Sequence, residues 1–98
     1  MEKATLILTA DQVRSAIDLE KDEMSDDDAT SYSQMASDFI MKKTSHDWGT
    51  TSSIARLVAE YFISDAYNRT SSHSTTIDLL LADLYDIVLK EGTSDGKA

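Results

Sequence analysis

Residues 32–40 read Tyr-Ser-Gln-Met-Ala-Ser-Asp-Phe-Ile, and this stretch decides the class of fold. Its apolar side chains recur at intervals of three and four residues, the spacing that lines one face of an α-helix; they are Tyr32, Met35, Ala36, Phe39 and Ile40. Ser25 and three aspartates precede the stretch, and Lys42 and Lys43 follow it. A helix dipole favours anions at its start and cations at its end. The pattern therefore predicts an amphipathic helix between the acidic run and the two lysines.

A second periodic stretch follows a polar connection at residues 44–50. Two adjoining apolar stripes cover most of its circumference; one holds Ile54, Leu57, Val58, Tyr61 and Phe62, and the other Ala55, Ala59, Ile63 and Ala66. A helix that is apolar over most of its surface is buried among other helices. We expect this helix to be the central one, to be capped by Thr51, Ser52 or Ser53, and to end near Asn68.

Weaker signals predict two more helices. Thr9 and Gln12 have the spacing of a capping box, in which each of the two side chains bonds the backbone amide of the other residue. We expect a mostly exposed helix there that fades near Met24. Another helix is expected from residues 74–76 to Lys90, with Gly92 as its stop, because glycine commonly ends helices.

The segment before the capping box is ambiguous. Residues 5–8 read Thr-Leu-Ile-Leu, and so short an apolar run cannot be assigned by periodicity alone. It is interpreted either as a short strand or as an apolar lead-in packed on the helices.

Composition supports a helical fold. The chain has 98 residues, no proline and three glycines, so few residues would break a helix and one domain is expected. We predict an all-α fold: a small antiparallel bundle of about four helices in residues 1–92, with a short N-terminal β-strand as an open addition and a flexible tail at 93–98.

The absence of cysteine excludes several kinds of site and favours one cellular compartment. With no cysteine among 98 residues, disulfides, thiolate zinc sites and cysteine catalysis are excluded. A domain of this size without disulfides is typical of a reducing environment. The N-terminus has no basic segment followed by a long apolar one, which is the pattern of a signal peptide. We therefore expect a cytoplasmic protein that does not cross or bind a membrane.

The charge balance points toward basic partners. There are 18 acidic and 9 basic residues, giving a net charge of −9. Residues 1–24, 25–49 and 70–92 each carry −3, whereas residues 50–69 are neutral. Non-specific binding to nucleic acid requires lysine and arginine against phosphates, and a helix-turn-helix interpretation of the last two helices would place aspartates where bases are read. Direct binding to nucleic acid is therefore not expected.

The most conspicuous polar feature is an acidic run. Its members are Asp22, Glu23, Asp26, Asp27 and Asp28. One interpretation is a helix cap with a solvated flank, and the other is a binding face for a basic partner. The run lacks the alternating ligands, glycine and closing glutamate of a calcium loop, so no metal site is expected.

Trp48 and two histidines lie in the predicted loops. Trp48 is the only tryptophan; it would either contact a partner or close the end of the bundle with its ring on the core and its N–H in water. His46 and His73 match no zinc-ligand spacing, and His46-Asp47 lacks a framed serine nucleophile. No catalytic residue, metal or cofactor is expected.

These observations predict a non-enzymatic protein-interaction module, acting as a regulator, an inhibitor or a small subunit. Its partner would be another protein with a basic surface, contacted through the acidic run and Trp48. One alternative is a decoy whose carboxylates mimic phosphates and block a nucleic-acid-binding enzyme, as anti-restriction and anti-CRISPR proteins of phages and mobile elements do. Another is a structural homodimer that pairs leftover apolar faces of the first or last helix.

Overall fold

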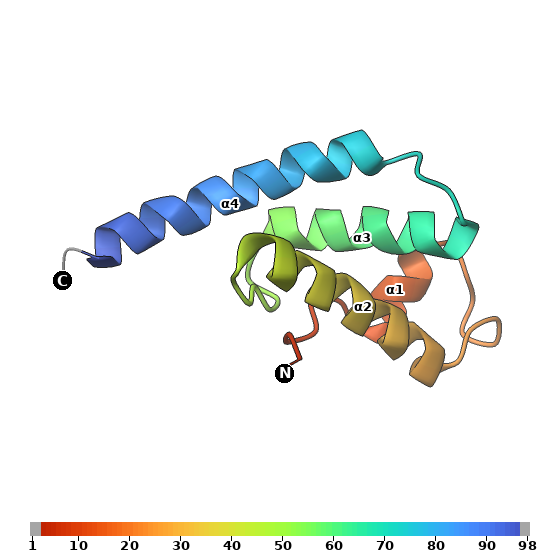
Figure 1. Cartoon of the computed structure of the whole chain (residues 1–98). Coiled ribbons are helices and arrows are strands. Elements are labelled where there is room, and N and C mark those ends of the chain that lie inside the picture. The colour runs from red at the N-terminus through yellow and green to blue at the C-terminus, as the bar shows by residue number, and fades with distance from the viewer. Residues whose placement is uncertain (1–2, 97–98) are drawn as a thin grey trace.

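Four helices form most of residues 3–96, the part of the chain that the computed structural model describes; side chains are described for residues 3–90 (Figure 1). The helices are α1 (Ala10–Ala16), α2 (Asp26–Thr44), α3 (Ser53–Asn68) and α4 (Ser74–Gly96). This arrangement confirms the predicted all-α bundle of four helices.

The helices α2 and α3 form the centre of the bundle. Each of them contacts the other three helices, whereas α1 and α4 make no contact with each other in the described residues. Consecutive long helices run in opposite directions, as predicted from their short polar connections (Figure 1). The prediction that the third helix is central is confirmed, but α2 shares this position with it.

Predicted caps start three of the helices. Thr9 Oγ1 accepts the amide of Gln12 at 3.2 Å, while the Gln12 side chain accepts the amide of Thr9 at 2.9 Å. Ser25 Oγ accepts the amide of Asp28 at the start of α2. At the start of α3, Ser52 Oγ accepts the amide of Ala55. These bonds satisfy backbone donors that the first turn of a helix leaves free.

The first helix is shorter than the sequence suggests. It ends at Ala16, and Asp18 adopts a left-handed backbone with φ of 58°. The amide of Leu19 then donates back to the carbonyl of Arg14 at 2.9 Å, so the chain turns instead of continuing. The prediction of a helix fading near Met24 is wrong, because the chain reverses at Asp18 and packs Leu19 and Met24 on the core outside any helix.

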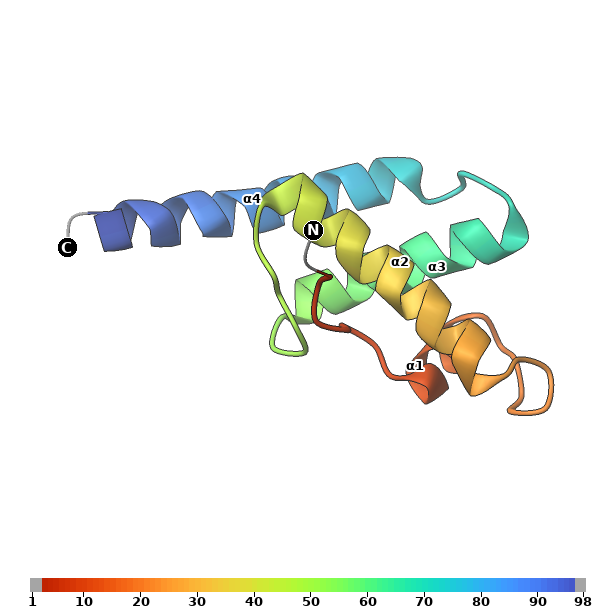
Figure 2. The same ribbon diagram turned by 60° about the horizontal axis from the view of Figure 1, so that its bottom comes forward.

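Residues 3–9 form no strand. The chain bends at Ile7 and Leu8, and both side chains are buried in the core. Figure 2 shows this N-terminal segment beside α2. Polar side chains of α2 supply the backbone partners: Ser37 Oγ accepts the amide of Ile7 at 3.0 Å, and Ser33 Oγ donates to the carbonyl of Leu8 at 2.7 Å. A helix face thus replaces the neighbouring strand, and the lead-in interpretation is confirmed.

The last helix continues beyond its predicted end. It passes through Gly92 and reaches Gly96. A glycine inside a helix lowers the stability of the helix by only about 1 kcal/mol relative to alanine, so it need not end the helix. The predicted stop at Gly92 is therefore wrong. The flexibility expected of residues 93–98 stays a prediction, and residues 97 and 98 lie outside the described part.

The core joins all four helices and the N-terminal segment. Its largest fully buried apolar side chains are Leu8, Ile40, Ile63, Leu84, Val13 and Val58. Every buried polar side-chain atom in the described residues has a hydrogen-bond partner. None of the described helices combines the length and apolar character needed to cross a membrane.

Candidate functional site

The acidic run lies in the loop before α2 and in its first turn. Asp22, Glu23, Asp27 and Asp28 are exposed, and Glu23 accepts the amide of Glu20 at 2.8 Å. Asp27 and Asp28 occupy the positive end of the helix dipole, where carboxylates stabilise the helix. Local structure therefore accounts for part of the run, and four carboxylates remain open to solvent.

Asp26 differs from its neighbours because it pairs with Arg14. The guanidinium of Arg14 is 4% exposed and contacts Asp11 at 2.6 Å and Asp26 at 2.8 Å. It also donates to the carbonyl of Met24 at 3.1 Å. The hydrogen bonds to Asp11 and then Asp26 raise the pKa of Arg14 above its usual value. Asp26 thus takes part in the ion pair that joins α1 to α2.

Trp48 is built into the end of the bundle. Its side chain is 9% exposed, and its Nε1–H donates to Thr44 Oγ1 at 2.9 Å. Thr44 in turn donates to the carbonyl of Ile40 at 2.8 Å, and the His46 ring meets the Trp48 ring edge-on. The expected wet N–H is therefore wrong, since a threonine replaces water, and little of the indole remains for a partner.

The histidine and aspartate beside Trp48 do not form a dyad. Asp47 instead fixes the N-terminal segment: its carboxylate accepts the amide of Thr5 at 3.0 Å and the hydroxyl of Thr5 at 2.8 Å. No group of three or more possible metal ligands occurs in the described residues.

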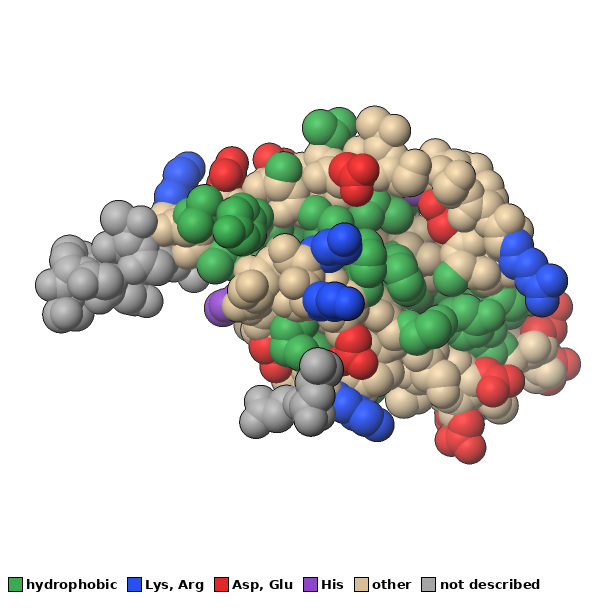
Figure 3. Space-filling view, viewed as in Figure 1, with side chains coloured by type: hydrophobic (Ala, Val, Ile, Leu, Met, Phe, Trp, Pro, Cys, Tyr) green, Lys and Arg blue, Asp and Glu red, His purple; other side chains and the backbone are tan. Residues whose placement is uncertain are grey.

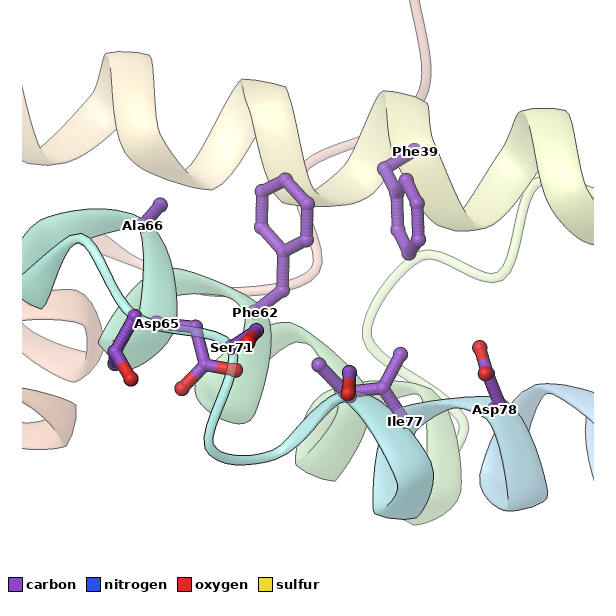
Figure 4. A pocket seen from close by; sticks show the side chains of 9 residues that line it. Phe39, Phe62, Asp65, Ala66, Ser71, Ile77 and Asp78 are labelled. Atoms are coloured by element: carbon purple, nitrogen blue, oxygen red, sulfur yellow. The ribbon is translucent and has the colours of Figure 1, made fainter.

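An apolar groove opens where α2, α3 and α4 meet, and the sequence did not predict it. Phe39 of α2 and Phe62 of α3 stack with ring centroids 4.7 Å apart, and both side chains are only half-buried. Ala66 and Ile77 extend the apolar lining, and the cavity measures about 300 Å³. Figure 4 shows the two rings side by side above the start of α4.

The groove continues as an apolar flank along α2. Met35 lies one turn before Phe39 and is 49% exposed. Tyr32, one turn further back, packs edge-on against Tyr67 of α3. Lys43 Nζ lies 5.7 Å from the centre of the Phe39 ring, within cation–π range. Figure 3 shows hydrophobic side chains gathered in a band on this face, between α2 and α4.

Polar groups line the other side of the groove. The lining there consists of Asp65, Thr70, Ser71, Ser74 and Asp78. Asp78 is exposed and gives the rim one acidic group, whereas Asp65 is mostly buried; the floor is apolar. Such a surface suits an apolar anchor flanked by a basic group.

Asp65 holds the loop between α3 and α4. One oxygen of its carboxylate lies 2.7 Å from His73 Nδ1, and the other accepts the backbone amide of His73 at 2.9 Å. Tyr61 stacks on the His73 ring with centroids 4.6 Å apart. Burial alone would raise the pKa of Asp65, but the hydrogen bonds and charge of His73 outweigh it and lower that pKa. The pair fixes α4 where it borders the groove.

The separate positions of these residues in the sequence explain why the groove was missed. Phe39 and Phe62 each fit a helical core stripe, and only the packing of α4 leaves their edges open. His73 and Asp65 are eight residues apart, a spacing that carries no local signal across a helix end. The groove, not the acidic run, is the candidate site that the fold assembles from distant segments.

Comparison of the chain with protein families, with curated proteins and with solved structures gave no match.

Proposed function

We propose that this protein is a non-enzymatic interaction module that binds another protein through the groove between α2, α3 and α4. The observation that carries this proposal is the half-buried stack of Phe39 on Phe62. Apolar rings left open at the meeting point of three helices match the way grooves receive the apolar face of a partner helix.

The charge of the protein favours a basic partner. The net charge is −9, and Asp78 is exposed at the rim of the groove beside the apolar floor. Long-range attraction of this kind speeds the encounter more than it sets affinity. The exposed carboxylates of the acidic run, Asp22, Glu23, Asp27 and Asp28, would add to that attraction, whereas Asp26 is exposed but already paired with Arg14.

The test blocks the groove without removing core contacts. Ala66 is exposed, lines the groove and lies on α3, so Ala66→Glu fills the site while retaining a helix-forming residue. Thr30→Glu on α2 is the matched control, because it makes the same charge change at an exposed position two and a half helical turns before Phe39, on the opposite face of the helix.

Both variants and the wild type would be used to capture partners from lysate of the source cells, followed by mass spectrometry. A partner recovered with wild type and Thr30→Glu, but lost with Ala66→Glu, is the expected result. Capture should also weaken as salt is raised, because salt screens the attraction between opposite charges. Equal recovery of the same partners by all three proteins would refute the groove as the binding site.

The decoy alternative depends on the acidic run instead. The open carboxylates of Asp22, Glu23, Asp27 and Asp28 support it, while Asp26 is paired with Arg14. If this alternative holds, Asp27→Ala/Asp28→Ala abolishes competition with DNA for the captured enzyme and Ala66→Glu does not. Recovery of no nucleic-acid-binding enzyme would exclude it.

A further inference from the structure

The groove belongs to an apolar track along the seam between α2 and α3. Two aromatic pairs mark this track: Phe39 stacks on Phe62, and Tyr32 packs edge-on against Tyr67. On α3, Ala66 lies between the two pairs, where it is exposed and lines the groove. The track thus has bulky side chains at both ends and a small one between them.

The length and chemistry of the track suit a helix. Tyr32 and Phe39 are seven residues apart, which is two helical turns or about 10 Å, and Met35 between them is 49% exposed. An extended segment would press its backbone amides and carbonyls against these apolar side chains without hydrogen-bond partners, which costs free energy. A helix satisfies those groups internally and contacts the track with side chains alone.

The two ends of the track carry opposite charges. Asp27 and Asp28 lie in the first turn of α2, and Lys42 and Lys43 lie in its last turn. Asp28 and Lys43 are each one turn outside the track, on the face of α2 that carries it. All four residues are exposed, and none of them takes part in an ion pair with another residue of the described chain.

Neighbouring charges reduce this difference without reversing it. Arg69 is exposed two residues after Tyr67, at the end of the track where the two aspartates lie. Asp78 lines the groove on the side of Phe39, at the end where the two lysines lie (Figure 4). Each of these is a single charge against a pair, so the aspartate end stays negative and the lysine end stays positive.

We infer that the groove binds an amphipathic helix of another protein that runs antiparallel to α2. The first turn of this helix carries acidic residues and lies at Lys42 and Lys43, and its last turn carries basic residues and lies at Asp27 and Asp28. A helix dipole favours the same order of charges within the partner, and antiparallel packing brings opposite dipole ends together. The inference rests on the proposed function, because it names the structure and the direction of the partner segment in the same groove.

A synthetic peptide of about four helical turns tests the direction. It carries leucines along one face of its two middle turns, glutamates in its first turn and lysines in its last. A nitroxide on its last residue should broaden the amide NMR signals of Asp27 and Asp28 in the whole chain, and a nitroxide on its first residue those of Lys42 and Lys43. With 19 residues, α2 is about 28 Å long, so the two patterns are distinct. The opposite pattern, equal broadening at both ends or no binding would overturn the inference.

Reversing the charge at one end of the track gives a second measurement. Lys42→Glu/Lys43→Glu should weaken binding of the peptide by at least about fivefold, because two attractions become repulsions. Lys21→Glu/Lys90→Glu is the matched control, since it makes the same change in net charge at two exposed lysines, one in the loop before α2 and one on α4. At about 0.15 M salt, which screens distant charges, this control should weaken binding by less than about twofold. Equal weakening by the two variants would contradict the inferred direction.

The capture test separates this inference from the proposed function. Ala66→Glu should abolish binding of the peptide as well as capture of the partner. If capture depends on Ala66 but the peptide binds in the reverse direction or not at all, the inferred helix direction is wrong and the groove remains the binding site. If capture is unchanged by Ala66→Glu, the proposed function itself fails.

Discussion

Replacing Ser37 by alanine tests whether a helix side chain takes the place of a strand partner for the N-terminal segment. Ser37 is 1% exposed and its Oγ accepts the amide of Ile7, itself 3% exposed, at 3.0 Å. Ser37→Ala leaves that amide buried with no acceptor, and no water can reach it without opening the segment.

The expected loss can be worked from these contacts. An unsatisfied buried donor costs about 1–3 kcal/mol, and the better helix propensity of alanine returns up to about 0.5 kcal/mol. The net destabilisation is about 0.5–3 kcal/mol, which corresponds to a fall in Tm of about 2–24 °C for a domain of this size.

Urea unfolding followed by the signal of Trp48 measures the free energy of unfolding. Ser31→Ala is the matched control, because Ser31 is exposed on the same helix and its replacement changes only helix propensity. Amide exchange at Ile7 should also quicken in Ser37→Ala. If Ser37→Ala is as stable as Ser31→Ala and the exchange of Ile7 is unchanged, the reasoning is refuted.

Two further predictions concern the core and the α3–α4 loop. Leu84→Ala should cost about 2.5–5 kcal/mol in urea unfolding, because Leu84 is fully buried, whereas Leu79→Ala, at a side chain 65% exposed, should change stability by less than about 0.5 kcal/mol. The pKa of Asp65 is lowered from 3.8 in the folded state, so its contribution is present above pH 3.8 and is lost as the pH falls through the lowered value. Asp65→Asn should flatten this part of the stability–pH curve, and a curve unchanged by the substitution would contradict the assigned role.

The local signals in the sequence were sufficient for the helices. The capping box at Thr9 and Gln12 and the serine cap at Ser25 act within one turn, so residue types at fixed spacing reveal them. The periodicity of residues 32–40 correctly predicted α2 for the same reason, since it too depends on spacing within the helix. Two boundaries failed: α1 ends at Ala16 because the chain reverses at Asp18, and α4 continues through Gly92 to Gly96.

The candidate site was predictable only in part. The exposure of Asp27 and Asp28 follows from their place in a first turn, but the pairing of Asp26 with Arg14 joins two helices and has no sequence signal. From the sequence, Trp48 could face either a partner or the core. In the structure its N–H donates to the hydroxyl of Thr44, and the ring lies on the core.

Composition and periodicity alone determine that this chain is an acidic bundle of four helices. Apolar residues spaced three and four apart lie on one face of a helix, so the spacing shows both that a helix forms and which face is buried. Tertiary structure decides which apolar side chains stay open. Phe39 and Phe62 fit ordinary core stripes in the sequence, and the structure leaves both half-buried at the groove between α2, α3 and α4. The physical reason is that a side chain is buried only when a second surface covers it. The pattern on one helix does not show where its neighbour begins or ends.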